Sequence, residues 1–179
     1  MKILYLSCHE VLHFDECSLL IELGHEVFCP GAFVCSDNPG DTGIRPGLPK
    51  CENYDSLMEE WHTFGKEGKD NKENISVEFF KKFDLVINMH IPLWISSNWE
   101  RIKKSGTPMV LRTIGQNVSS NESQIAKFKQ EGLKIVRYSP KERLIPGYVG
   151  EDALIRFYKD PDEFQGWTGE TESVISFAQ

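Results

Sequence analysis

Six short apolar runs recur along the chain, each of a length that suits a strand buried on both faces of a sheet. Stretches with helical spacing of apolar residues separate most of these runs. Strands that alternate with helices predict parallel pairing, so we expect an α/β fold: a doubly wound, Rossmann-like parallel sheet of about six strands with helices on both faces. The expected strands cover residues 2–7, 26–29, 85–89, 108–112, 134–138 and 153–158.

Local signals mark where the expected helices begin and end. Glycines that follow apolar helical runs predict C-caps, because glycine readily adopts the left-handed conformation of that position. Serines predict N-caps, and two of them precede a glutamate by three residues, the spacing of a capping box. The glycines are Gly24, Gly106 and Gly132, and the serines are Ser76, before the cluster Phe79, Phe80 and Phe83, and the capping-box pairs Ser97/Glu100 and Ser119/Glu122.

A long segment between the second and third strands is rich in proline and glycine. This density over residues 30–53 excludes regular structure for most of the segment, and only a weak helical pattern follows, over residues 55–64. A loop of this length is either functional or a mobile insertion, and the sequence leaves both interpretations open.

Composition bounds the class of protein. A chain of 179 residues suits one domain, and no apolar run reaches the roughly 20 residues of a membrane span, so we expect a cytoplasmic protein. The five cysteines are odd in number and lack a Cys-x-x-Cys spacing, which favours reduced thiols.

Charge is spread unevenly along the chain. The net charge of −7 argues against nucleic acid as a partner, but residues 101–145 hold ten Lys and Arg against three Glu. Solvated helix faces are the common explanation for such a stretch. Peripheral contact with an anionic acceptor or an anionic membrane surface is the alternative.

Two nucleotide-binding motifs are absent. No Gly-x-Gly-x-x-Gly follows the first strand, and no Walker sequence occurs. A dinucleotide-dependent dehydrogenase and a P-loop nucleotidase are therefore both disfavoured.

Candidate ligand-binding residues follow the expected strands, because open parallel sheets bind ligands at the carboxyl ends of their strands. His90 follows a central strand and could donate a hydrogen bond to a sugar hydroxyl, or be satisfied by a neighbouring carbonyl. Arg112 offers an anion a guanidinium fork, although a structural ion pair is slightly favoured. The remaining candidates are His9 and Glu10 after the first strand, and Gly115 and Gln116 after the fourth.

One spacing raises the question of a metal. His9, His13 and Cys17 are four residues apart, which on a helix would place three metal-capable groups on one face. However, we expect His9 to lie in a loop and Cys17 to face the core. We therefore predict no zinc site from these residues.

The order of four motifs resembles the N-terminal half of GT-B glycosyltransferases, which are built from two Rossmann domains, and is closest to the retaining family 4-like group. The motifs cover residues 83–90, 110–116, 135–140 and 154–164. The resemblance implies that residues 1–159 form the acceptor-binding domain. It also implies that residues 160–179 are the interdomain linker and the first strand of a truncated or missing C-terminal domain, which would supply nucleotide-sugar binding in cis or in trans.

The same resemblance implies roles for individual residues. His90 is similar to the family's strand-end histidine, which contacts the donor sugar, and His9, Glu10, Gly115 and Gln116 would face the interdomain cleft. It implies transfer of a hexose from a nucleotide-sugar to a saccharide or lipid-linked acceptor by the full-length protein, without a metal or other cofactor, and no turnover by this chain alone. The family's glycine-rich turn after the first strand is missing here.

Two alternatives belong to other classes. The first is a stand-alone flavodoxin-like module that binds a ligand or regulates without catalysis. The second is a small hydrolase or deacetylase, which would need the acid and histidine cluster that His9, His13 and Asp15 offer only loosely.

Overall fold

The sheet is the organising element of the computed structural model, which describes residues 1–7, 10–30, 48–64, 74–89, 92–115 and 122–157. Six strands pair in parallel in the order β2-β1-β3-β4-β5-β6. The Rossmann-like α/β class predicted from the sequence is confirmed. The strands are β1 (Lys2–Leu6), β2 (Glu26–Phe28), β3 (Leu85–Met89), β4 (Met109–Arg112), β5 (Lys134–Arg137) and β6 (Ala153–Leu154).

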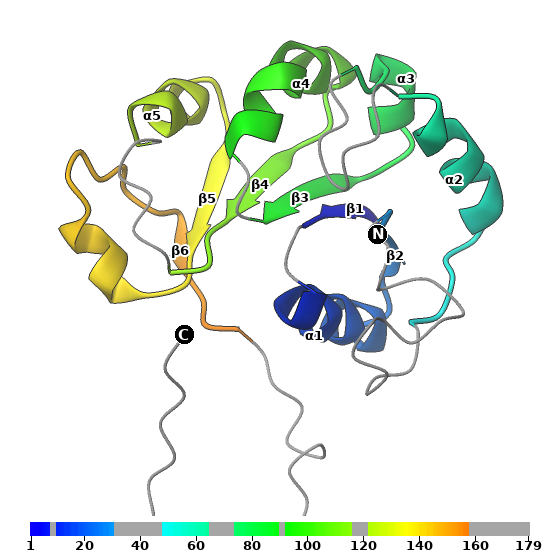
Figure 1. Cartoon of the computed structure of the whole chain (residues 1–179), viewed down its shortest axis with the longest axis horizontal. Coiled ribbons are helices and arrows are strands. Elements are labelled where there is room, and N and C mark those ends of the chain that lie inside the picture. The colour runs from blue at the N-terminus through cyan, green and yellow to red at the C-terminus, as the bar shows by residue number, and fades with distance from the viewer. Residues whose placement is uncertain (8–9, 31–47, 65–73, 90–91, 116–121, 158–179) are drawn as a thin grey trace, which may run out of the picture.

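Helices cover the two faces of the sheet unequally (Figure 1). Helix α1 (Glu10–Glu22) lies on one face, whereas α3 (Val77–Phe80), α4 (Pro92–Ser105) and α5 (Glu122–Gln130) lie on the other. Helix α2 (Tyr54–His62) adds Leu57 and Trp61 to the core beneath α3 and α4. Because α1 is the only helix on its face in the described ranges, the predicted double winding is not clear. We call these the α1 face and the α5 face.

The strand order reverses direction between β1 and β3. The chain steps from β1 through α1 to β2, and β3 then pairs with the opposite side of β1. Right-handed crossovers that step in opposite directions place their helices on opposite faces. The carboxyl ends of β1 and β3 therefore form the topological switch point, where open α/β sheets bind ligands.

Most helix ends follow the predicted signals. Gly24, Gly106 and Gly132 have φ values of 81°, 75° and 112°, which confirms them as left-handed residues after helices. The Ser76 side chain accepts a hydrogen bond from the Phe79 amide at 3.0 Å, the predicted N-cap.

The capping box predicted at Ser97 and Glu100 is wrong, because α4 begins at Pro92 and both residues lie inside it. Proline suits the first turn of a helix, where its missing N–H would have had no partner and its φ is already helical. Ser119 of the other predicted box lies outside the described residues, as do residues 160–179 and most of the 30–53 loop.

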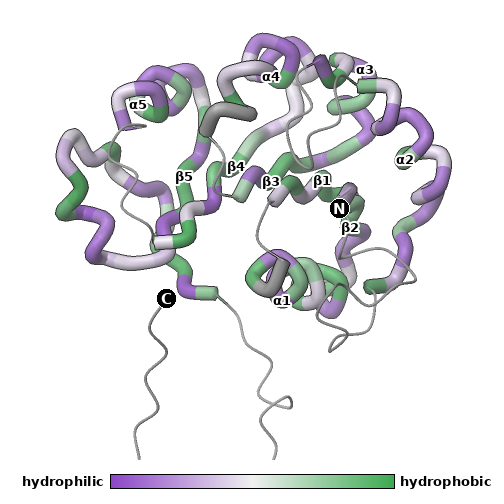
Figure 2. Tube along the Cα trace, viewed as in Figure 1, coloured by the Kyte–Doolittle hydropathy of each residue, from purple (hydrophilic) through white to green (hydrophobic). Residues whose placement is uncertain are grey.

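Two buried clusters fill the space on either side of the sheet. Aromatic rings dominate the cluster on the α5 face, where Phe79 packs against Phe28, Trp61, Phe64 and Phe83. The cluster on the α1 face is smaller and includes two thiols. Figure 2 shows hydrophobic residues concentrated along the central strands. In the described ranges no helix combines the length and the apolar character needed to cross a bilayer.

Candidate functional site

The segments singled out from the sequence follow four neighbouring strands. β1, β3, β4 and β5 lie side by side and parallel, so their carboxyl ends lie at one edge of the sheet. His9, His90 and Gln116 lie outside the described residues. Glu10 begins α1, and the structure does not describe its side chain.

Ser7 joins the two strands of the switch point. Its side chain is 6% exposed, and its hydroxyl donates to the Met89 sulfur at 3.3 Å. Met89 is the last residue of β3, so the contact fixes the spacing of the two strand ends that precede His9 and His90.

Arg112 forms the ion pair that the sequence slightly favoured. Its Nε donates to Glu16 of α1 at 2.8 Å, and its guanidinium lies 4.4 Å from the centre of the Phe157 ring. The side chain is 4% exposed, yet Nη1 and Nη2 have no hydrogen-bond partner among the described residues. Arg112 therefore has a structural role through one nitrogen, and two donor nitrogens without a partner in the described part of the chain.

Glu16 connects Arg112 to the core of the α1 face. Its carboxylate also accepts a hydrogen bond from the Tyr5 hydroxyl at 2.5 Å. Burial, and then the negative charge of Glu16, raise the pKa of Tyr5 well above its ordinary value, so Tyr5 stays protonated and donates.

A groove of about 250 Å³ runs beside α1 over the middle of the sheet. Its floor is formed by alternate residues of three strands, which all face the same side because strand side chains alternate. The groove is largely apolar, with the Arg112–Glu16 pair among its walls. The lining residues are Glu16, Leu19, Leu20, Ile87, Val110, Arg112, Val136, Ile155 and Arg156.

Gly115 occupies a position that only glycine fits. Its φ is 83°, and a Cβ atom there would lie 2.6 Å from Cδ1 of Tyr138. The Tyr138 ring stacks on Phe157 with centroids 4.7 Å apart, so the turn after β4 packs against the same aromatic group as Arg112. The predicted role of Gly115 in a ligand cleft stays a prediction.

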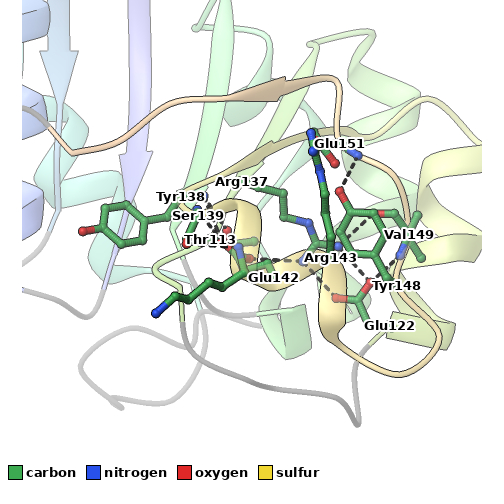
Figure 3. A network of polar contacts seen from close by, with 11 residues as sticks. Thr113, Glu122, Arg137, Tyr138, Ser139, Glu142, Arg143, Tyr148, Val149 and Glu151 are labelled. Carbon is green, nitrogen blue, oxygen red and sulfur yellow. Dashed lines mark hydrogen bonds and ion pairs between the residues drawn. The ribbon is translucent and has the colours of Figure 1, made fainter.

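A second buried arginine was missed by sequence reasoning. Arg137 ends β5 and donates from Nη1 and Nη2 to the two oxygens of Glu122 at 2.9 and 2.8 Å (Figure 3). Glu142 and the Val149 carbonyl accept from it at 3.4 and 3.0 Å. The sequence did contain one signal for this group of contacts. Ser139 precedes Glu142 by three residues, and the two form a capping box at the 3₁₀ helix η2 (Pro140–Leu144).

The basic stretch 101–145 is largely paired with acids. Lys103 contacts Glu131 at 2.7 Å, and Asp152 accepts from Lys129 and Lys134 at 3.4 and 3.3 Å. Arg143 pairs with Glu151. This pairing favours an ordinary solvated surface over a membrane-binding one.

Three metal-capable side chains meet between α1 and the end of β2. One ligand atom from each of His13, Cys17 and Cys29 lies within 4.8 Å of the other two, and all three residues are buried. Cys17 faces the core, as predicted. Burial lowers the pKa of His13 to about 3, so its imidazole is neutral at physiological pH.

The hydrolase alternative gains no support from this arrangement. His13 and Asp15 are both buried, but residues two apart on a helix point to different sides. The pair therefore does not form an acid and histidine site.

Comparisons with protein-family models, with curated proteins and with solved structures found no match to this chain.

Proposed function

We propose that the chain is the acceptor-binding half of a nucleotide-sugar glycosyltransferase, and that a second domain, in cis or in trans, supplies donor binding. The observation that carries the proposal is the reversal of strand order between β1 and β3. It brings together the carboxyl ends of β1 and β3, which His9 and His90 follow in the sequence, at the switch point where open α/β sheets bind ligands.

His90 is the central residue of the proposal. It directly follows Met89 in the sequence, and the Met89 sulfur accepts a hydrogen bond from Ser7, the residue after the neighbouring strand β1. Met89 ends β3 at the carboxyl edge of the sheet, and the imidazole of the residue that follows it in the sequence can donate a hydrogen bond to a sugar hydroxyl. Helix α4 begins at Pro92, so its amino end, which favours anions, lies at the same edge.

The unequal cover of the sheet supports the need for a second unit. The α1 face carries one helix in the described ranges and an open apolar groove over β3, β4 and β5. Apolar grooves of this kind are usually covered by a partner or another part of a protein. This chain alone is then expected to have no transferase activity.

The stand-alone flavodoxin-like module is the second candidate, and the strand order favours it. The sequence β2-β1-β3-β4-β5 is the order of flavodoxin-like sheets, whose ligand sits at the switch point between β1 and β3. Both candidates use the same edge of the sheet. They differ in whether this chain alone holds a nucleotide.

The proposal is tested by titrating the chain with a panel of mono- and disaccharides and a short-chain lipid-linked sugar. Binding is measured by calorimetry and by the change in melting temperature. We expect saccharide binding by the native chain alone. Once a donor-binding domain is supplied, we expect His90→Ala to lose nucleotide-sugar binding and His25→Ala to keep it. His25 is half-buried just before β2, at the opposite edge of the sheet, so it is the matched control. Nucleotide-sugar binding that survives His90→Ala, or no saccharide binding at all, contradicts the proposal.

A further inference from the structure

The cluster of His13, Cys17 and Cys29 is built by the opening strand–helix–strand unit. His13 and Cys17 are four residues apart on α1, so both side chains lie on one face of the helix. Cys29 follows the last residue of β2 and lies two positions after Val27. Because strand side chains alternate, Cys29 and Val27 both face α1, and both belong to the α1-face cluster.

The three side chains are close enough to share one ion. Nε2 of His13 is in direct contact with the Cys29 sulfur, and the three ligand atoms lie within 4.8 Å of one another. Ligands around tetrahedral zinc stand roughly 3.5 to 3.8 Å apart, given bonds of about 2.3 Å to sulfur and about 2.0 Å to nitrogen. The widest separation in the cluster, at most 4.8 Å, exceeds this spacing by about 1 Å.

The aromatic ring of Tyr5 holds the histidine in place. The Tyr5 and His13 rings stack with centroids 5.0 Å apart and planes inclined by 17°. The Tyr5 hydroxyl is itself fixed by Glu16. Metal-binding histidines need such support, because ring orientation decides where the nitrogen lone pair points.

We propose that His13, Cys17 and Cys29 bind one zinc ion, which ties α1 to the carboxyl end of β2. Two thiolates balance the charge of a divalent cation, so the site is neutral and suits its apolar surroundings of Val27, Leu48 and Met89. Thiolate and imidazole ligands are the set that zinc prefers over hard cations. The proposal does not depend on glycosyl transfer, and it departs from the sequence-based prediction of no metal.

Binding is a proton-for-metal exchange. The two S–H bonds break, both protons pass to the buffer, and each sulfur donates an electron pair to Zn²⁺ without any change of oxidation state. We therefore expect about two protons to be released per ion, which calorimetry in buffers of different ionisation enthalpy measures.

The direct test uses Co²⁺ as a spectroscopic probe of the reduced, chelator-treated chain. With a water molecule as the fourth ligand beside the three protein ligands, we expect one equivalent to give the visible bands of a four-coordinate site and a thiolate charge-transfer band, both displaced by Zn²⁺. Cys17→Ser and Cys29→Ser should each lower zinc affinity by at least about 100-fold, because even the loss of a supporting residue costs ten- to a hundredfold. Cys51→Ser is the matched control, since Cys51 is a half-buried thiol outside the cluster.

Several outcomes would overturn the proposal. These are the absence of a thiolate band in the native chain, and a band of undiminished intensity and unchanged cobalt affinity in Cys29→Ser. If either variant fails to fold, X-ray absorption of the zinc-loaded native chain decides instead. Two sulfurs at about 2.3 Å and at least one nitrogen at about 2.0 Å support the site, whereas a shell with no sulfur, or with sulfur only, contradicts it.

Discussion

The two faces of the sheet each bury one arginine at a strand end, and they treat it differently. On the α5 face, Arg137 donates to Glu122, Glu142 and a carbonyl, and only its Nε lacks a partner in the described structure. On the α1 face, Arg112 has one bond to Glu16 and two nitrogens without a described partner.

The difference extends to the surroundings of each arginine. The α5 face has three helices and a continuous aromatic core, which is the arrangement of a face that stabilises the fold. The α1 face has one described helix, an open groove, and a cluster of histidine and thiols. Buried polar groups that are only partly satisfied are costly, so the two nitrogens of Arg112 without a described partner, against one in Arg137, suggest a ligand or partner on the α1 face.

The largest loss of stability is expected from a substitution on the α5 face. Arg137→Met should lower the free energy of unfolding by about 3 to 5 kcal/mol, because it leaves the buried carboxylates of Glu122 and Glu142 uncompensated. Urea denaturation measures the change. Arg143→Met is the control, since Arg143 is 57% exposed and its pair with Glu151 should contribute less than about 1 kcal/mol. Equal losses of unfolding free energy in Arg137→Met and Arg143→Met would contradict a stabilising role for the buried contacts of Arg137.

A smaller loss is expected at the turn after β4. Gly115→Ala should cost about 2 to 3 kcal/mol, from the left-handed conformation and the clash with Tyr138 together. Gly24→Ala shares the positive φ but has open space around it, so about 1 kcal/mol is expected. Thermal unfolding of the two variants separates the cost of the left-handed conformation from the cost of the steric clash. Identical decreases in melting temperature would show that the Tyr138 side chain moves away from the added Cβ without cost.

Arg112→Met should cost only about 1 kcal/mol. Glu16 is 15% exposed and keeps the Tyr5 hydroxyl as a donor, while the substitution removes from the interior two nitrogens that have no partner among the residues the structure describes. Denaturant unfolding of Arg112→Met beside Arg137→Met tests this directly. A loss as large as that of Arg137→Met would mean that the two faces do not differ as described.

The smallest effect concerns pH at the rim of the α5 face. The Trp99 indole N–H donates to Glu131 at 2.6 Å, and hydrogen bonds from Lys103 first and then Trp99 lower the pKa of this carboxyl below its ordinary 4.5. The stabilisation is therefore present above pH 4.5 and is lost as pH falls through the lowered value. Tryptophan fluorescence should change below pH 4.5 in the native chain and not in Glu131→Gln.

Much of the fold could be predicted from the sequence because its signals are local. Strands buried on both faces are continuous apolar runs, and glycines after helices mark left-handed residues, as at Gly24 and Gly106. The start of α4 was missed because Pro92 suits both the end of a strand and the first turn of a helix, and a local pattern does not separate the two.

The polar contacts of the site could not be predicted in the same way, because they join residues far apart in the chain. Arg112 and Glu16 are 96 positions apart, and Cys29 meets His13 only because the sheet places β2 beside β1. The spacing of His13 and Cys17 was visible, but the third ligand suggested by that spacing, His9, lies outside the described residues.

The central claim is that this chain is one half of a glycosyltransferase cleft. The most direct test is a calorimetric titration of the chain alone with UDP, GDP and their sugars, repeated after addition of a donor-binding domain. We predict no nucleotide binding by the chain alone and binding that requires both halves. Micromolar binding of a nucleotide by this chain alone would contradict the claim and favour the stand-alone module.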